Sequence, residues 1–125
     1  MFSLFLVMLG GALGSGARYL TGVAMLRLCG PTFPFGTLTV NIVGGLAMGL
    51  LVGILARLSV PGENWRLMIA VGILGGYTTF SSFSLDMANM LQRGDLGLAL
   101  GYAVLSVAGS VAALFAGLAL VRVAA

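Results

Sequence analysis

The sequence predicts an all-α integral membrane protein, a single membrane domain over residues 1–125 that crosses the bilayer four times. Hydrophobic residues make up 60% of the chain and charged residues only 7%, and the mean hydropathy is +1.15. A soluble domain carries roughly a quarter charged residues, because its surface must face water. Most of the surface of this chain must therefore face hydrocarbon.

Four stretches are long and apolar enough to form membrane helices. Crossing a bilayer takes roughly 20 apolar residues in a helix, because the hydrocarbon core is about 30 Å thick. We predict helices over about 2–26, 36–56, 66–90 and 96–121. The connectors between them are short and contain proline and glycine, which are typical of turns. Short connectors require neighbouring helices to run antiparallel.

The charged residues exclude several classes of function. Six arginines and three acidic residues give a net charge of +3, and the chain has no histidine. The arginines are scattered singly, as residues that anchor helices at a membrane interface are, so we expect no binding to nucleic acid. One cysteine, Cys29, allows no intrachain disulfide. Zinc, haem and Cys–His catalysis lack ligands, so we expect no enzyme.

The arginines are divided almost equally between the two membrane faces. With four crossings, the face that holds both termini carries three of them, and the opposite face carries two or three: Arg57, Arg66 and Arg122 against Arg27, Arg93 and, if it counts with its helix end, Arg18. An excess of Lys and Arg on one face sets the orientation of a membrane protein. Its near absence predicts dual topology, in which two oppositely inserted chains pair.

The third apolar stretch is interrupted by polar residues. Residues 75–84 read Gly-Gly-Tyr-Thr-Thr-Phe-Ser-Ser-Phe-Ser, near the middle of the span. Such a cluster predicts a broken helix, whose freed carbonyls and amides need partners. In transporters, breaks of this kind bind ions near the bilayer centre. Ser and Thr bonding back to a continuous helix is the alternative, but it does not explain the adjacent glycines.

Polar stripes also mark the second and fourth helices. Thr37 and Asn41 share one face of the second, and Tyr102, Ser106 and Ser110 recur every four residues along the fourth. Asn supplies amide donors, and the hydroxyls donate hydrogen bonds without carrying a charge. Hydrogen bonding between helices is the simpler interpretation of these stripes.

The polar groups together suit a small anion. Phe80 and Phe83 share one helical face, and the edge of an aromatic ring is positive. Amides, hydroxyls and ring edges can replace the water around an anion that passes dehydrated through a pore. Arg18, near a membrane end, either draws anions to the mouth or extends its guanidinium to the headgroups.

Four motifs in order carry a resemblance that covers nearly the whole chain. The chain resembles the Fluc (CrcB-type) fluoride ion channels, bacterial four-helix proteins that export toxic fluoride. The motifs are Gly10-Gly11-x-x-Gly14-x-x-x-Arg18-Tyr19, Gly36-Thr37-Leu38-Thr39-Val40-Asn41-x-x-Gly44, the run at 75–84, and Tyr102-x-x-x-Ser106-x-x-x-Ser110.

The resemblance implies an antiparallel dual-topology homodimer in the bacterial inner membrane, with two fluoride pores lined by both subunits and passive export. Arg18 would lie at an aqueous vestibule. Carbonyls of Gly75 and Thr78 from both chains would hold a structural Na⁺ at the dimer centre. Pairing with the product of a second homologous gene is the alternative to self-pairing. The implied pore residues are Asn41, Phe80, Phe83, Ser81, Ser82, Tyr102, Ser106 and Ser110.

Two positions depart from the family pattern. Ser82 stands where Thr is common, and it keeps the hydroxyl. Asp86 stands where Glu is expected, so the shorter carboxylate either serves the pore or is hydrogen-bonded within the dimer.

Two rival functions fit the sequence less well. A small multidrug exporter needs a carboxylate inside the membrane, typically in the first helix, but the first acidic residue here is Glu63, in a connector. A purely structural membrane subunit would need no polar stripes.

Overall fold

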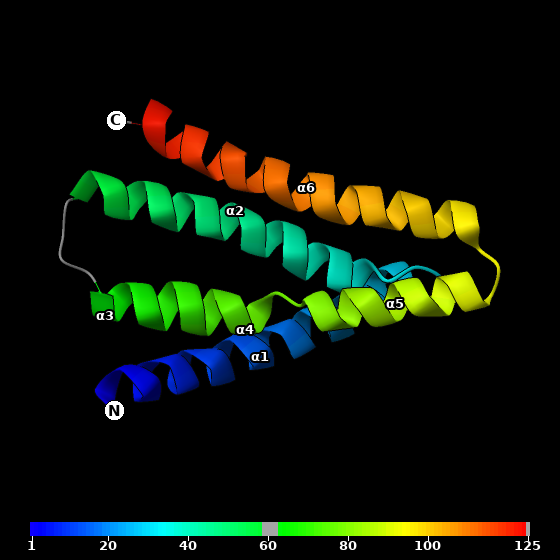
Figure 1. The fold of residues 1–125 in the computed structure, drawn as a ribbon, viewed down its shortest axis with the longest axis horizontal. Coiled ribbons are helices and arrows are strands. Elements are labelled where there is room, and N and C mark those ends of the chain that lie inside the picture. The colour runs from blue at the N-terminus through cyan, green and yellow to red at the C-terminus, as the bar shows by residue number, and fades with distance from the viewer. Residues whose placement is uncertain (59–62, 125) are drawn as a thin grey trace.

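A computed structural model describes residues 1–58 and 63–124, and in these ranges the regular structure is entirely helical (Figure 1). Four helical stretches are long and apolar enough to cross a membrane, which confirms the four predicted spans. The central part of the second predicted connector, residues 59–62, lies outside the described ranges. The elements are α1 (Phe2–Cys29), α2 (Phe35–Leu58), α3 (Glu63–Trp65), the π-helix η1 (Arg66–Leu74), α4 (Gly75–Tyr77), α5 (Phe80–Gln92) and α6 (Leu96–Val123).

Each span extends beyond its predicted limits by a few residues, and the first, second and fourth continue past an arginine that the prediction placed after the helix. The first helix, for example, continues through Arg27 to Cys29. It ends at Gly30, which has φ 80° and whose N–H donates to Leu26 O at 2.9 Å. Glycine adopts positive φ without the steric penalty that other residues meet. Gly94, with φ 82°, forms the equivalent turn between α5 and α6.

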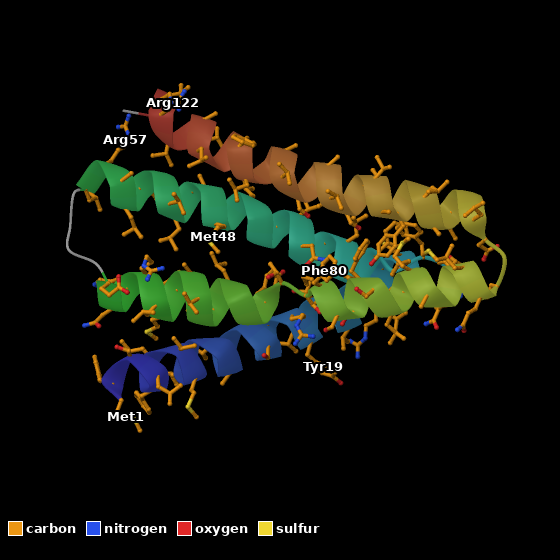
Figure 2. The ribbon with its side chains drawn as sticks, in the orientation of Figure 1. Met1, Tyr19, Met48, Arg57, Phe80 and Arg122 are labelled. Atoms are coloured by element: carbon orange, nitrogen blue, oxygen red, sulfur yellow. The ribbon has the colours of Figure 1, made fainter. Side chains whose placement is uncertain are left out.

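Both termini lie at one end of the molecule, as an even number of crossings requires (Figure 1). Arg57 and Arg122 lie at this same end (Figure 2), where Arg57 Nη2 donates to Arg122 O at 3.2 Å. At the opposite end, Arg93 pairs with Asp95. The structure therefore divides these arginines between the two ends as the sequence predicts.

Glycine allows the long helices to pack closely. A Cβ atom at Gly49 would overlap the carbonyl oxygen of Leu114, and one at Gly14 would overlap that of Ile73. The first contact joins α2 to α6, and the second joins α1 to η1. Close approach of this kind is typical of membrane helices, whose association depends on van der Waals contact.

Apolar side chains cover the outside of the long helices. Val104 and Phe115 on α6, for example, are each 64% exposed, whereas Val40 and Tyr102 are the largest fully buried side chains in the described part. An outer surface of this composition is stable in hydrocarbon and not in water. The protein is a multi-pass membrane protein.

Candidate ion pathway

The third span leaves helical geometry at two threonines. α4 ends at Tyr77 and α5 begins at Phe80, and the backbone between them is extended, with ψ 158° at Thr78 and 119° at Thr79. Asn41 of α2 binds this segment twice: its Nδ2 donates to Thr79 O at 3.0 Å, and Thr79 N donates to its Oδ1 at 2.8 Å. The side-chain amide of Asn41 thus pairs with the backbone N–H and C=O of Thr79, as a backbone amide would. Asn41 stabilises the extended segment and keeps a second N–H on Nδ2.

The threonine side chain starts the next helix. Thr79 Oγ1 accepts a hydrogen bond from Ser82 N at 3.1 Å, so Thr79 is the N-cap of α5. Thr is a preferred N-cap because its oxygen satisfies an amide that has no partner inside the helix. Thr79 is not among the predicted site residues, although a threonine before a helical run is a recognised start signal.

These two contacts change the surroundings of two carbonyls. In a continuous α-helix, Thr79 N would donate to Gly75 O and Ser82 N to Thr78 O, four residues earlier. The first amide donates instead to Asn41, and the second to the Thr79 side chain. The carbonyls of Gly75 and Thr78 therefore lose their helical donors, and each can accept a hydrogen bond or a cation.

Arg18 lies inside its span. In the structure, α1 continues for eleven residues after Arg18 to Cys29, about 16 Å along a helix axis. Its Nε donates to Gly76 O at 3.1 Å, next to the extended segment. The guanidinium is therefore directed to a backbone carbonyl of the third span. A nearby contact joins the same two spans, with Tyr77 OH 3.0 Å from Thr21 Oγ1.

A groove of about 390 Å³ is lined by predicted pore residues from three helices, α2, α5 and α6. Figure 2 places Phe80 midway along the molecule, at the start of α5. Its ring is 76% exposed, and its centroid lies 5.6 Å from that of Phe83. The groove also passes Thr78 and Thr79. The predicted pore residues that line it are Asn41, Phe80, Phe83, Ser106 and Ser110.

Two hydroxyls in the wall of the groove are buried and make no hydrogen bond with the described residues. Ser106 Oγ and Ser110 Oγ have no hydrogen-bond partner among the described residues. Leaving a buried polar group unpaired costs about 1–3 kcal/mol. Such groups therefore call for a functional explanation. Here they are donors positioned beside two phenylalanine rings.

Tyr102 lies behind the groove and is fully buried. Its ring centroid is 5.2 Å from that of Phe83, and its hydroxyl donates to Asp86 Oδ2 at 2.9 Å. The sequence left two interpretations of Asp86 open. In the structure, its carboxylate accepts a hydrogen bond from its own chain, so the shorter arm of Asp reaches the tyrosine.

Ser81 and Ser82 do not line the groove. Ser81 is exposed, with its Oγ 3.3 Å from Thr79 Oγ1. Ser82 lines a second cavity, of about 310 Å³, together with Arg18 and Thr79. The reason is helical geometry, because side chains one or two positions apart face different directions on a helix. The structure thus separates these two serines from the phenylalanines between which they lie in the sequence.

Comparison with known proteins places the chain in a family. A family model described as "CrcB-like protein, Camphor Resistance (CrcB)" matches residues 5–118. A Sphingopyxis alaskensis protein named "Fluoride-specific ion channel FluC" is 56% identical over 122 residues, 98% of this chain and 97% of its own length. Proteins of the same name from Mesorhizobium japonicum and Caulobacter vibrioides are 53% and 54% identical over 98% of this chain, and 98% and 97% of theirs. The resemblance seen in the motifs is confirmed: the chain belongs to the CrcB family.

Proposed function

We propose that this protein is a fluoride-selective ion channel of the bacterial inner membrane, through which toxic fluoride leaves passively down its electrochemical gradient. It is not an enzyme, since its family consists of channels. The observation that carries the proposal is the groove in which the unpartnered hydroxyls of Ser106 and Ser110 lie beside Phe80 and Phe83. Its relatives are named for fluoride, and the chemistry of the groove suits that ion.

Fluoride is a small anion that holds its hydration water strongly, so a pore must offer hydrogen-bond donors in exchange. The groove offers the hydroxyls of both serines and the second N–H of Asn41. The positive edges of the two phenylalanine rings add attraction where no hydrogen bond is available. No Arg, Asp or Glu lines this groove among the described residues, so an anion inside it meets neutral donors, which release it readily.

The open side of the groove suggests a second chain. Phe80 is 76% exposed at its rim. An antiparallel homodimer would bring a second copy against each groove and form two pores, each lined by both subunits. The near-equal division of arginines supports insertion in both orientations. Labelling of a C-terminal tag from each side of the membrane tests this arrangement, and a tag found on one side only would contradict it.

A second cavity, lined by Arg18, Thr79 and Ser82, would serve as the aqueous vestibule. The Arg18 guanidinium would concentrate anions there. From this cavity the hydroxyl of Ser82 would lead an ion toward Thr79, which lines both the cavity and the groove, with the Ser81 hydroxyl 3.3 Å from Thr79 Oγ1. Tyr102, whose ring contacts that of Phe83, would continue the hydroxyl track if its hydroxyl hydrogen turned from Asp86 to the ion.

Carbonyl oxygens of Gly75 and Thr78 fit a structural Na⁺ at the dimer centre. Both have lost their helical donors to other contacts, and alkali and alkaline-earth cations prefer oxygen ligands. When bound, the ion would supply positive charge that holds the extended segments of two chains together. Thermal stability of the purified dimer should then increase with NaCl and not with N-methylglucamine chloride at equal ionic strength.

Fluoride efflux from liposomes tests the proposed function. Liposomes that contain the purified protein are loaded with potassium fluoride, and a fluoride electrode follows release after valinomycin is added. We expect rapid release of fluoride, and little release of chloride from matched liposomes loaded with potassium chloride. A well-folded protein that releases no fluoride alone, and none with a homologous partner chain, would contradict the proposal.

A further inference from the structure

A third cavity, of about 360 Å³, opens at the end of the molecule opposite the termini. It lies between the end of α1, residues 30–34, the start of α2 and the second half of α5. Its wall is formed by polar as well as apolar atoms. Its polar side chains include those of Thr37, Asp86, Asn89 and Arg93.

Tyr102 contacts one residue of the groove and one of the cavity. Phe83 lines the groove, and Asp86 lines the cavity. Tyr102 touches both, with its ring 5.2 Å from Phe83 between centroids and its hydroxyl 2.9 Å from Asp86 Oδ2. The polar groups of the groove therefore continue through Tyr102 to the polar groups of this cavity.

The wall of the cavity is held by aromatic packing. Phe33 meets the ring of Tyr102 edge to face, at a centroid distance of 5.3 Å and an interplanar angle of 83°. The ring of Phe35 packs against that of Phe33, at a centroid distance of 4.9 Å. Such pairs are favourable beyond the area that they bury. The loop that closes the cavity is thus anchored on the residue that links it to the groove.

The wall of the cavity carries both negative charge and one arginine. Asp86 places a carboxylate in the wall, and the C-terminal end of α5 adds the negative end of a helix dipole. Both repel an anion. Arg93 is the C-cap of α5 and lines the same cavity, with its side chain 57% exposed. Its Nε donates to Asp95 Oδ2 at 3.2 Å, which partly neutralises its charge.

We propose that this cavity is one mouth of the anion pathway, and that Arg93 concentrates small anions there, with Asn89 supplying an amide donor. The proposal rests on the proposed function, because it gives that pathway an end. It assigns Arg93 an electrostatic role and not only that of a membrane anchor.

The test compares single substitutions in the intact protein. Fluoride efflux is measured from liposomes at low ionic strength and again with N-methylglucamine gluconate added on both sides, which leaves the potassium gradient unchanged. At about 10 mM ionic strength the Debye length is about 30 Å, so we expect R93Q to lower the initial rate about three-fold. In about 0.5 M salt the difference should nearly vanish. D95N removes the partner of the guanidinium and should raise the rate at low salt.

The matched control is R27Q, which removes an equal charge at the same end. Arg27 is exposed in the last turn of α1 and does not line the cavity. A smaller effect in R27Q than in R93Q, with opposite effects in R93Q and D95N, would support the mouth. Equal effects of R27Q and R93Q, or an effect of R93Q that persists in high salt, would overturn it. Efflux through the unsubstituted protein tests the channel function separately.

Discussion

Asn41 and Thr79 exchange two hydrogen bonds, of 3.0 and 2.8 Å, although they lie 38 residues apart in the sequence. The Asn41 amide takes the place of a backbone partner for Thr79. It thereby allows the third span to leave helical geometry in the interior of the membrane, where an unpaired amide is costly. The Asn41 side chain thus both stabilises the third span and lines the groove. A substitution of Asn41 should therefore affect both stability and conduction.

Asn41→Asp should weaken both the fold and conduction. A carboxylate cannot donate to Thr79 O, so about 1–3 kcal/mol of stability is lost with this buried contact. The new negative charge would also repel an anion in the groove. We expect a lower melting temperature in detergent and a severe loss of fluoride efflux. Efflux at the unsubstituted rate would contradict an ion-lining role of Asn41.

Ser106→Ala and Ser110→Ala should separate stability from function. Neither hydroxyl has a partner among the described residues, so its removal leaves no other group unpaired. We therefore expect an unchanged or slightly raised melting temperature. Hydrogen bonds to a charged group are worth about 1.5–3 kcal/mol, so efflux should fall about ten-fold or more. Ser→Thr variants, which keep the hydroxyl, should recover part of the rate. A stable double alanine variant with normal efflux would remove these residues from the pathway.

Phe80→Ile and Phe83→Ile should slow efflux severely and leave the assembly intact. Isoleucine retains apolar volume but has no positive ring edge to present to an anion. The control is Phe115→Ile, an exposed phenylalanine on α6 that does not line the groove. Size-exclusion chromatography checks the assembly. Fluoride efflux through both groove variants at the rate of the control would contradict the proposed role of the rings.

Gly49→Ala should destabilise the protein through the α2–α6 contact. The added Cβ would overlap Leu114 O, a backbone atom that cannot move aside. Overpacking of this kind costs about 1–3 kcal/mol. Gly101→Ala on α6 is the matched control, because a Cβ there meets no atom within 4 Å. Thermal unfolding in detergent should show a loss for the first variant and none for the second.

The sequence by itself determined the spans, because hydropathy along a helix is a local property. The four apolar stretches became the four long helical stretches, and their limits changed by only a few residues. The spacing of Ser106 and Ser110 also predicted correctly that they share a face, since helical periodicity is regular. Family membership followed from motifs that can be read in order along the chain.

The tertiary structure alone decided which polar groups meet. That Asn41 pairs with Thr79, and Tyr102 with Asp86, depends on how separate helices pack, which no local pattern encodes. The same packing directs Arg18 to Gly76 O within the span. It also places Ser82 in a different cavity from Phe83, although the two are adjacent in the sequence. The physical reason is that each helix turns neighbouring side chains to different sides, and only packing settles what lies on each side.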